Sequence, residues 1–221
     1  MNPPMQKQNP YPSLDGLYAA VVADVLDSLG YRGQTFAPDI RALTPVHRVA
    51  GRVFTARAET VPGVPDEPYK LEMAAVDGLT AGDVLVCDAG NDTSCGFWGE
   101  LLSTACLYKD VKGVVMSACT RDMWKIKSLD FAVFGIGYQP ADSKGRVDIV
   151  EIGKPITISG VKAKTGDLIL GDEDGVVVIP SEVAEDTIRQ AKEKIAGENT
   201  VRDELANGMP ITEAFAKYGI L

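Results

Sequence analysis

The stretch from Gly99 to Asp122 constrains the fold of this chain more than any other part of the sequence. It begins with a helical pattern at Glu100, turns at Gly113 and continues as an apolar run of the kind that forms a buried strand. It closes on the pair Arg121 and Asp122. In α/β proteins, ligands bind beside helix N-termini and beyond the carboxyl ends of strands. If this helix and strand pack side by side, Glu100, Arg121 and Asp122 meet in one place.

Helical and strand patterns also alternate through the first two thirds of the chain. Ser13 is placed to cap a helix whose apolar residues recur at helical spacing until Gly30 ends it. A polar, glycine-containing loop is expected over 88–92, and a proline-rich loop, possible as a lid, over 62–68. The remaining expected elements are strands over 51–59, 84–87, 113–118 and 131–134 and helices over 69–76 and 123–129.

The last third changes character, because short strand patterns separated by glycines dominate it. The acidic turn 171–175 lacks the ligand spacing of a calcium loop and predicts a hairpin turn. A long polar helix is expected after Ser181, with a break at Gly197. Because α and β patterns mix throughout without a linker, we expect one α/β domain over 13–221, ending in this helix and preceded by an N-terminal arm over 1–12. The remaining expected strands are 147–152, 155–158, 167–170 and 176–179.

Charge and cysteine content exclude several classes of protein. With 31 acidic and 22 basic side chains, the net charge of −9 argues against nucleic acid as a partner, since phosphate binding needs a basic face. No apolar run approaches the roughly 20 residues of a transmembrane helix, and the N-terminus lacks the apolar core of a secretory signal. The four cysteines lack zinc-site spacing, which favours reduced thiols in a cytoplasm and small apolar fillers over a reactive thiol.

Each residue of the candidate site has an ordinary interpretation beside a functional one. Arg121 and Asp122 can form a surface ion pair, or Arg121 can grip a substrate carboxylate while Asp122 holds a hard divalent cation. Glu100 can simply complement the helix dipole, or it can position a water molecule. The amides of Leu101 and Leu102, in the first turn of the helix, are free to bind a ligand carboxylate.

Other catalytic arrangements find less support. His47 is the only histidine and lies away from the central stretch, so a serine or cysteine nucleophile lacks a partner base. No glycine-rich phosphate-binding sequence is present. A Schiff base through a nearby lysine is conceivable, although a solvated face is the simpler interpretation. The lysines around the site region are Lys109, Lys112, Lys125 and Lys127.

At these residues the chain resembles a known family. An acidic residue at Glu100, followed after twenty residues by Arg121 and Asp122, resembles the signature of the 4-hydroxy-4-methyl-2-oxoglutarate aldolase family, also called the regulator-of-ribonuclease-E-activity-like family. Further segments of the chain match in order and spacing. They include Val-Ala-Asp-Val-Leu-Asp-Ser-Leu-Gly near the N-terminus, the strand over 49–57, the segment 82–86 and the segment 171–180.

The resemblance implies a layered α-β-β-α fold of the swivelling-domain kind, assembled as homotrimers or hexamers with active sites between subunits. It also implies a class II, metal-dependent pyruvate aldolase that decarboxylates oxaloacetate as well. By match, Asp122 would ligate Mg²⁺ or Mn²⁺ through a water-rich shell, and Arg121 would bind the 2-oxo acid and its enolate. The substrate carboxylate would bind at the turn that starts at Gly99, where the amides of Leu101 and Leu102 would donate hydrogen bonds to it.

The resemblance further implies that Glu100 orients the catalytic water and that Glu198 reaches the metal waters of a neighbouring subunit. Two departures from the family pattern bear on the substrate: Glu100 stands where aspartate is more usual, and 117–120 reads Ser-Ala-Cys-Thr where Asp-Gly is common before the Arg-Asp pair. The regulator branch of the family offers an alternative, a protein without catalysis that inhibits an endoribonuclease through its surface. A quinone-precursor methyltransferase would need a cofactor loop that the sequence lacks.

Overall fold

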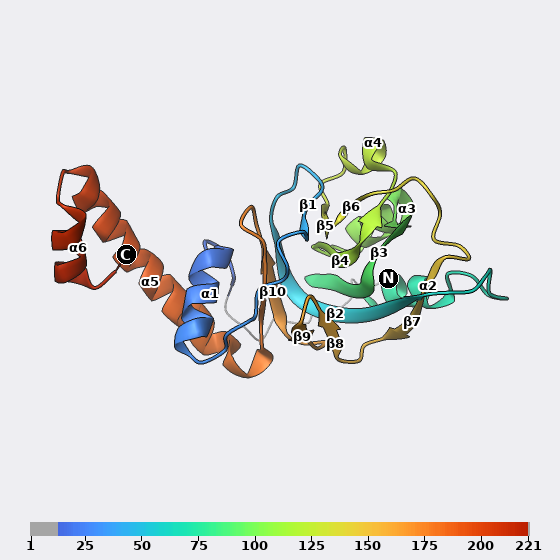
Figure 1. Cartoon of the computed structure of the whole chain (residues 1–221), viewed down its shortest axis with the longest axis horizontal. Coiled ribbons are helices and arrows are strands. Elements are labelled where there is room, and N and C mark those ends of the chain that lie inside the picture. Colours follow the sequence, from blue (N-terminus) through green and yellow to red (C-terminus); the bar gives the residue numbers. More distant parts are fainter. Residues whose placement is uncertain (1–12, 221) are drawn as a thin grey trace, which may run out of the picture.

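A mixed nine-stranded sheet forms the main body of the molecule in a computed structural model that describes residues 13–220, and α5 and α6 extend from one side of it (Figure 1). The expected arm over 1–12 lies outside the described residues. Strand order is β1-β5-β4-β3-β2-β10-β11, with β6 paired to β4 and β7 to β2, and β8 and β9 form a separate hairpin. The strands are β1 Arg41–Ala42, β2 Val49–Thr60, β3 Asp83–Trp98, β4 Gly113–Thr120, β5 Ala132–Gly135, β6 Gly137–Tyr138, β7 Val147–Ile152, β8 Ile156–Ile158, β9 Val161–Ala163, β10 Leu168–Gly171 and β11 Val176–Ile179.

Strands β2, β3, β4 and β5 run parallel and carry the helical crossovers of an α/β protein. The helices are α1 Ala19–Ser28, α2 Lys70–Gly78, α3 Glu100–Tyr108, α4 Met123–Ile126, α5 Ala184–Ala206 and α6 Ile211–Tyr218, with a 3₁₀ turn η1 Ser181–Val183 before α5. Helices α2, α3 and α4 connect successive parallel strands. The carboxyl ends of β3 and β4 therefore lie at the same end of the sheet, next to the start of α3.

The sheet nearly closes into a barrel. At the β11 edge, the amide of Phe36 donates to Val176 O at 2.9 Å, and the amide of Val178 donates to Gln34 O at 2.9 Å. The same segment continues into β1, which pairs with β5 at the opposite edge of the sheet. This connection leaves few strand edges without a partner, which protects a sheet from edge-to-edge association.

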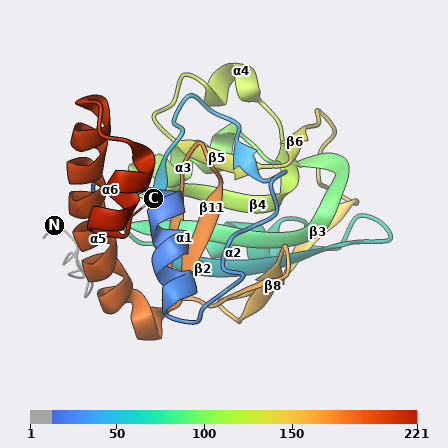
Figure 2. The same ribbon diagram turned by 60° about the vertical axis from the view of Figure 1, so that its left-hand side comes forward.

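Side-chain alternation along the strands divides the core into layers. Every residue of β4 is buried, because its alternate side chains face the barrel interior and the helices α2, α3 and α4. On the opposite wall, β10 and β11 turn Leu168, Leu170, Val177 and Ile179 toward α1 and α5. Helix α1 lies against both α5 and β11 (Figure 2). The result is the expected single α/β domain with α-β-β-α layers.

Three local expectations were wrong. Ser13 does not cap the first helix, which begins at Ala19. The Ala19 amide instead donates a hydrogen bond to Asp172 Oδ2 at 2.6 Å. The predicted loop over 88–92 belongs to β3, which bulges over this segment and resumes its pairing with β4. Helix α5 runs through Gly197 without a break, and α6 then folds back on its end (Figure 1).

The other expected elements agree with the structure to within a few residues. The acidic segment 171–175 is the hairpin turn between β10 and β11, where the Asp172 amide donates to Gly175 O at 2.9 Å. Segment 62–68 contains neither helix nor strand. Within residues 13–220, no helix combines the length and the apolar character needed to cross a membrane.

Candidate functional site

The register between β3 and β4 brings the predicted site residues together. Trp98, the last residue of β3, pairs with Thr120, the last residue of β4. The Arg121 amide donates to Trp98 O at 2.8 Å, and the Thr120 hydroxyl donates to the same oxygen at 2.9 Å. The residues that follow each strand, Glu100 on one side and Arg121 and Asp122 on the other, are therefore neighbours.

Asp122 links the two strand ends directly. Its carboxylate Oδ2 accepts a hydrogen bond from the amide of Glu100 at 3.2 Å, at the N-terminus of α3. Its backbone is left-handed, with φ of +60°, a conformation that aspartate tolerates better than most residues with a Cβ. The carboxylate thus lies in the positive field of a helix N-terminus, and its side chain stays 40% exposed and open to a ligand.

Two glycines make this approach possible. A Cβ on Gly99 would lie 2.7 Å from Asp122 Oδ2, although the backbone of Gly99 is extended and suits any residue. A Cβ on Gly96 would lie 2.2 Å from the carbonyl oxygen of Gln139 and 2.6 Å from Arg121 Cβ. Both glycines serve close packing of β3 against the Arg121–Asp122 turn.

Arg121 lies between two carboxylates. Its Nε is 3.7 Å from Asp122 Oδ2, and its Nη1 is 3.1 Å from Oδ1 of Asp142, in the segment between β6 and β7. The Tyr69 hydroxyl, at the start of α2, donates to Asp142 Oδ2 at 2.7 Å. The Arg121 side chain is 34% exposed, so a ligand can reach the guanidinium.

The ionisation of the surrounding groups follows from burial and from Arg121. Burial and the hydrogen bond to Asp142 raise the pKa of Tyr69 to about 12, so this hydroxyl remains a donor at neutral pH. Burial works to raise the pKa of Asp142, but the Tyr69 hydrogen bond and the Arg121 charge outweigh it and lower that pKa. Glu72, on α2, has its pKa raised to about 7 by burial and by the charges of Asp148 and Asp142, against the opposing charge of Arg121.

The first turn of α3 contributes an acid and two amides. The Glu100 side chain accepts the Thr104 hydroxyl at 3.0 Å, so it is directed along the helix surface. Inside an α-helix the first N–H groups have no partner, which leaves the amides of Leu101 and Leu102 as candidate donors to a ligand. The Leu101 side chain is 79% exposed, so residues 13–220 leave it largely uncovered.

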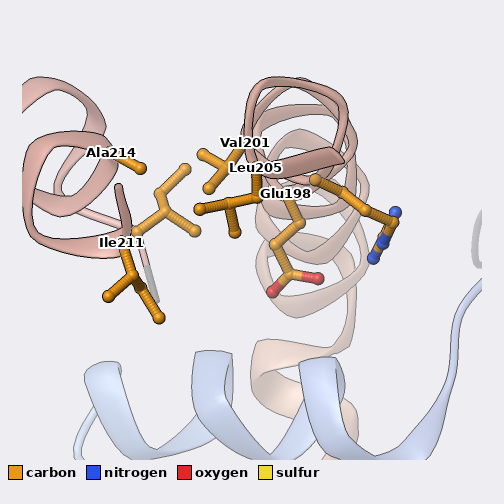
Figure 3. A pocket seen from close by; sticks show the side chains of 7 residues that line it. Glu198, Val201, Leu205, Ile211 and Ala214 are labelled. Carbon is orange, nitrogen blue, oxygen red and sulfur yellow. The ribbon is translucent and has the colours of Figure 1, made fainter. Parts of the chain in front are cut away.

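Glu198 does not join this group within one chain. It lies on α5, and its carboxylate accepts a hydrogen bond from the Tyr18 hydroxyl at the start of α1. Figure 3 shows this carboxylate pointing toward α1 at the border of a cavity of about 430 Å³. The apolar wall of the cavity comes from α5 and α6, at the opposite end of the molecule from α3 and α4 (Figure 1).

The remaining chemistry-bearing residues lie outside the site. All four cysteines are buried, and burial raises the pKa of each thiol, which agrees with their interpretation as apolar fillers. The Lys109 ammonium donates to the carbonyl oxygens of Val76 and Asp77 at the end of α2. His47 is exposed in the segment between β1 and β2.

Any metal ion held by the described part of the chain would have few protein side chains as ligands. Residues 13–220 contain no group of three or more His, Cys, Asp or Glu side chains arranged to hold a metal ion. Asp122 is a single carboxylate whose Oδ1 enters none of the hydrogen bonds or ion pairs between described residues. One carboxylate fits Mg²⁺, which keeps several waters and is often held by one or two carboxylates together with substrate oxygens.

Three residues near Arg121 carry no signal in the sequence that marks them as site residues: Tyr69, Glu72 and Asp142. Tyr69 and Glu72 lie in a weak helical pattern behind the proline-rich loop, and Asp142 lies in an irregular segment. Neither place carries a periodic signal that distinguishes a site residue from a solvated one. Long-range packing alone brings these groups to Arg121.

Known relatives agree with the predicted resemblance. The family model described as RraA-like, Aldolase/RraA, matches residues 19–178. A protein of Halalkalibacterium halodurans named "Putative 4-hydroxy-4-methyl-2-oxoglutarate aldolase" is 33% identical over 143 residues, which are 65% of this chain and 68% of that protein. Protein DlpA of Legionella pneumophila is 26% identical over 204 residues, 90% of this chain but 32% of DlpA, so the chain spans about a third of that relative's length.

A solved structure extends the likeness to the fold. Streptomyces coelicolor RraAS2, described as an unusual member of the RNase ES inhibitor RraA protein family, superposes with a TM-score of 0.79 at 26% identity. The match covers 86% of this chain and 95% of RraAS2. Because the family model covers well over half of the sequence and the fold agrees, the chain belongs to the RraA-like family of aldolases and RraA proteins.

Proposed function

We propose that the protein is a divalent-metal-dependent carbon–carbon lyase of small 2-oxo acids. It would cleave 4-hydroxy-4-methyl-2-oxoglutarate-type substrates to release pyruvate, and it would decarboxylate oxaloacetate. One observation carries this proposal: Arg121, Asp122 and the N-terminus of α3 meet in one partly exposed site. They bring together a guanidinium, a carboxylate and helix amides. The name of the Halalkalibacterium halodurans relative supports the same reaction class.

The chain's own residues divide the work by their chemistry. Arg121 binds the substrate carboxylate and provides a fixed positive charge where enolate charge develops. The amides of Leu101 and Leu102 add hydrogen bonds to the same carboxylate. Glu100 orients a water molecule that accepts the hydroxyl proton as the carbon–carbon bond breaks in retro-aldol cleavage. In decarboxylation, loss of CO₂ leaves the same enolate, which takes a proton to become pyruvate.

Asp122 is the residue that would hold Mg²⁺ or Mn²⁺, with water and substrate oxygens completing the shell. Such a cation supplies Lewis-acid polarisation of the 2-oxo group. In the homotrimer or hexamer that the family resemblance implies, Glu198 of one subunit would approach the metal waters of its neighbour. Within the chain Glu198 binds the Tyr18 hydroxyl, so that role requires Glu198 to share or leave this hydrogen bond.

Oxaloacetate and Mg²⁺ provide the direct test. We expect the protein to produce pyruvate faster than the Mg²⁺-containing buffer alone, and we expect a chelator to abolish the difference, because the proposed activity depends on a bound divalent cation. Pyruvate is measured by its reduction with a coupled dehydrogenase. The same assay is repeated with Mn²⁺ in place of Mg²⁺. Equal rates with and without protein across a panel of 2-oxo acids would refute the lyase.

Gly99→Ala is expected to lower kcat/KM by on the order of 100-fold, because the new methyl group displaces the Asp122 carboxylate that it would otherwise approach to 2.7 Å. Stability should change little, since the extended backbone of Gly99 suits alanine and the displaced group ends a partly exposed side chain. Gly78→Ala is the matched control, because its Cβ would meet Phe54 at an ordinary 3.6 Å. Unchanged kcat/KM in Gly99→Ala would contradict the placement of Asp122 at the reaction centre.

A surface regulator is the second candidate function. Similarity to RraAS2 and the net charge of −9 favour it, because an acidic surface suits a basic segment of an endoribonuclease. The oxaloacetate assay separates the two functions, since a protein that acts only by binding releases no pyruvate. Inhibition of RNase ES by this protein without any turnover of 2-oxo acids would favour the regulator.

A further inference from the structure

Three segments that are far apart in the sequence meet at the carboxylate of Asp142. One oxygen, Oδ1, is 3.1 Å from Arg121 Nη1, and the other, Oδ2, accepts the Tyr69 hydroxyl at 2.7 Å. The backbone of Asp142 forms a bridge with Gly96, and the Gly96 amide donates to Ala141 O at 2.8 Å. Asp142 is therefore tied to the end of β3 through its main chain and to two other elements through its side chain.

The contact between Asp142 and Arg121 leaves the guanidinium able to bind a ligand. Among residues 13–220, the Arg121 side chain forms ion pairs with Asp122 and Asp142 but donates no side-chain hydrogen bond. A guanidinium carries five N–H donors, and at 34% side-chain exposure these donors remain accessible. Asp142 thus sets the place of the charge from the Nη1 side, and the other guanidinium donors stay available to a substrate carboxylate.

Tyr69 is held in an uncommon backbone conformation at this point. Its φ is +63° and its ψ is 11°, in the left-handed region that aromatic residues rarely adopt, and it precedes the first residue of α2. Such strain persists where the surrounding structure enforces it, and it concentrates at functional sites. Here the strained residue directs its hydroxyl to Asp142, which links the end of the 62–68 loop to the candidate site.

We propose that Asp142 and Tyr69 are positioning residues, which hold the Arg121 guanidinium in the place where it binds the carboxylate of a 2-oxo acid. Tyr69 fixes Asp142 by its hydrogen bond, and Asp142 fixes Arg121 by its charge. Neither residue needs to touch the substrate. The proposal rests on the proposed function, since it gives Arg121 a substrate to bind.

Kinetics of Asp142→Asn and Tyr69→Phe test the proposal with oxaloacetate and Mg²⁺. Because Arg121 binds the substrate carboxylate and also faces the enolate charge that develops in the transition state, poorer positioning raises KM and lowers kcat as well. We expect KM to rise about fivefold in Asp142→Asn, which removes a partly exposed ion pair, and about threefold in Tyr69→Phe, which removes one hydrogen bond. Tyr218→Phe is the matched control, because it removes a similar hydrogen bond, 3.0 Å to Glu204, at α6.

A readout without substrate separates this proposal from the proposed function. The Nε–H resonance of Arg121 in ¹⁵N NMR, assigned by its loss in Arg121→Lys, should shift or broaden in Asp142→Asn and Tyr69→Phe but not in Tyr218→Phe. An unchanged resonance in Asp142→Asn, an unchanged KM, or a lower melting temperature as the only effect would overturn the positioning role. If the wild type turns over no 2-oxo acid, the lyase proposal fails, and the resonance alone decides whether Asp142 and Tyr69 hold Arg121.

Discussion

Asp122→Asn is expected to leave the protein folded and to reduce oxaloacetate decarboxylation by about 10³-fold, equivalent to about 4 kcal/mol of transition-state stabilisation. Asparagine tolerates the left-handed backbone at this position, and its amide oxygen can still accept the Glu100 amide hydrogen bond. The substitution therefore removes the negative charge that would hold a dication while it preserves the turn between β4 and α4. Asp122→Ala should lose activity to the same extent and some stability as well.

Initial rates of pyruvate formation over a range of Mg²⁺ concentrations provide the measurement. Excess metal should not rescue Asp122→Asn, because the missing group is the ligand. The chain offers a closely matched control in Asp110→Asn: Asp110 is exposed, has φ of +56° and pairs with Lys112 in the turn before β4. Wild-type rates in Asp122→Asn would mean that the dication is held elsewhere.

The second large effect is expected on stability rather than on turnover. Glu72 is 7% exposed, and its pKa is raised from 4.5 to about 7 by burial and by the charges of Asp148 and Asp142. Between these two pH values the folded protein keeps a proton that the unfolded chain has released. The free energy of unfolding should therefore fall as pH rises from about 5 to 8, by about 3 kcal/mol for this group.

Glu72→Gln removes this dependence because the amide does not ionise. We expect the variant to match the wild type at pH 5 and to exceed its free energy of unfolding by about 3 kcal/mol at pH 8. Urea unfolding at the two pH values measures the difference, with Glu67→Gln as an exposed control in the loop before α2. An equal difference between wild type and Glu72→Gln at both pH values would show that Glu72 does not retain its proton in the fold.

The candidate site and the C-terminal helices occupy opposite ends of one chain (Figure 1). The proposed approach of Glu198 to the metal waters therefore requires a neighbouring subunit that brings its α5 to the site. Leu101 and Trp124, both about four fifths exposed, flank the site on α3 and α4. Burial of these side chains in an assembly of subunits would be consistent with that condition.

The local sequence pattern was sufficient to predict most helices and strands and the position of part of the candidate site. The apolar run that became β4 predicted burial on both faces, and the positions of Glu100 and Arg121 at element ends followed from where the apolar patterns stop. These features depend on side-chain periodicity and on the unpaired groups of helix ends, which are properties of neighbouring residues in one segment. The family signature lies in the same short-range pattern.

Tertiary structure alone decided which distant groups complete that pattern. The carboxylate that accepts the first amide of α1 is Asp172, on a hairpin 153 residues away, rather than the nearby Ser13. Segment 88–92 is polar and contains glycine, yet β3 carries it as a bulge because pairing with β4 resumes beyond it. Asp142 and Tyr69 reach Arg121 only after three segments pack. Periodicity describes which face of a segment is buried, whereas the partner of that face is set by packing among all segments at once.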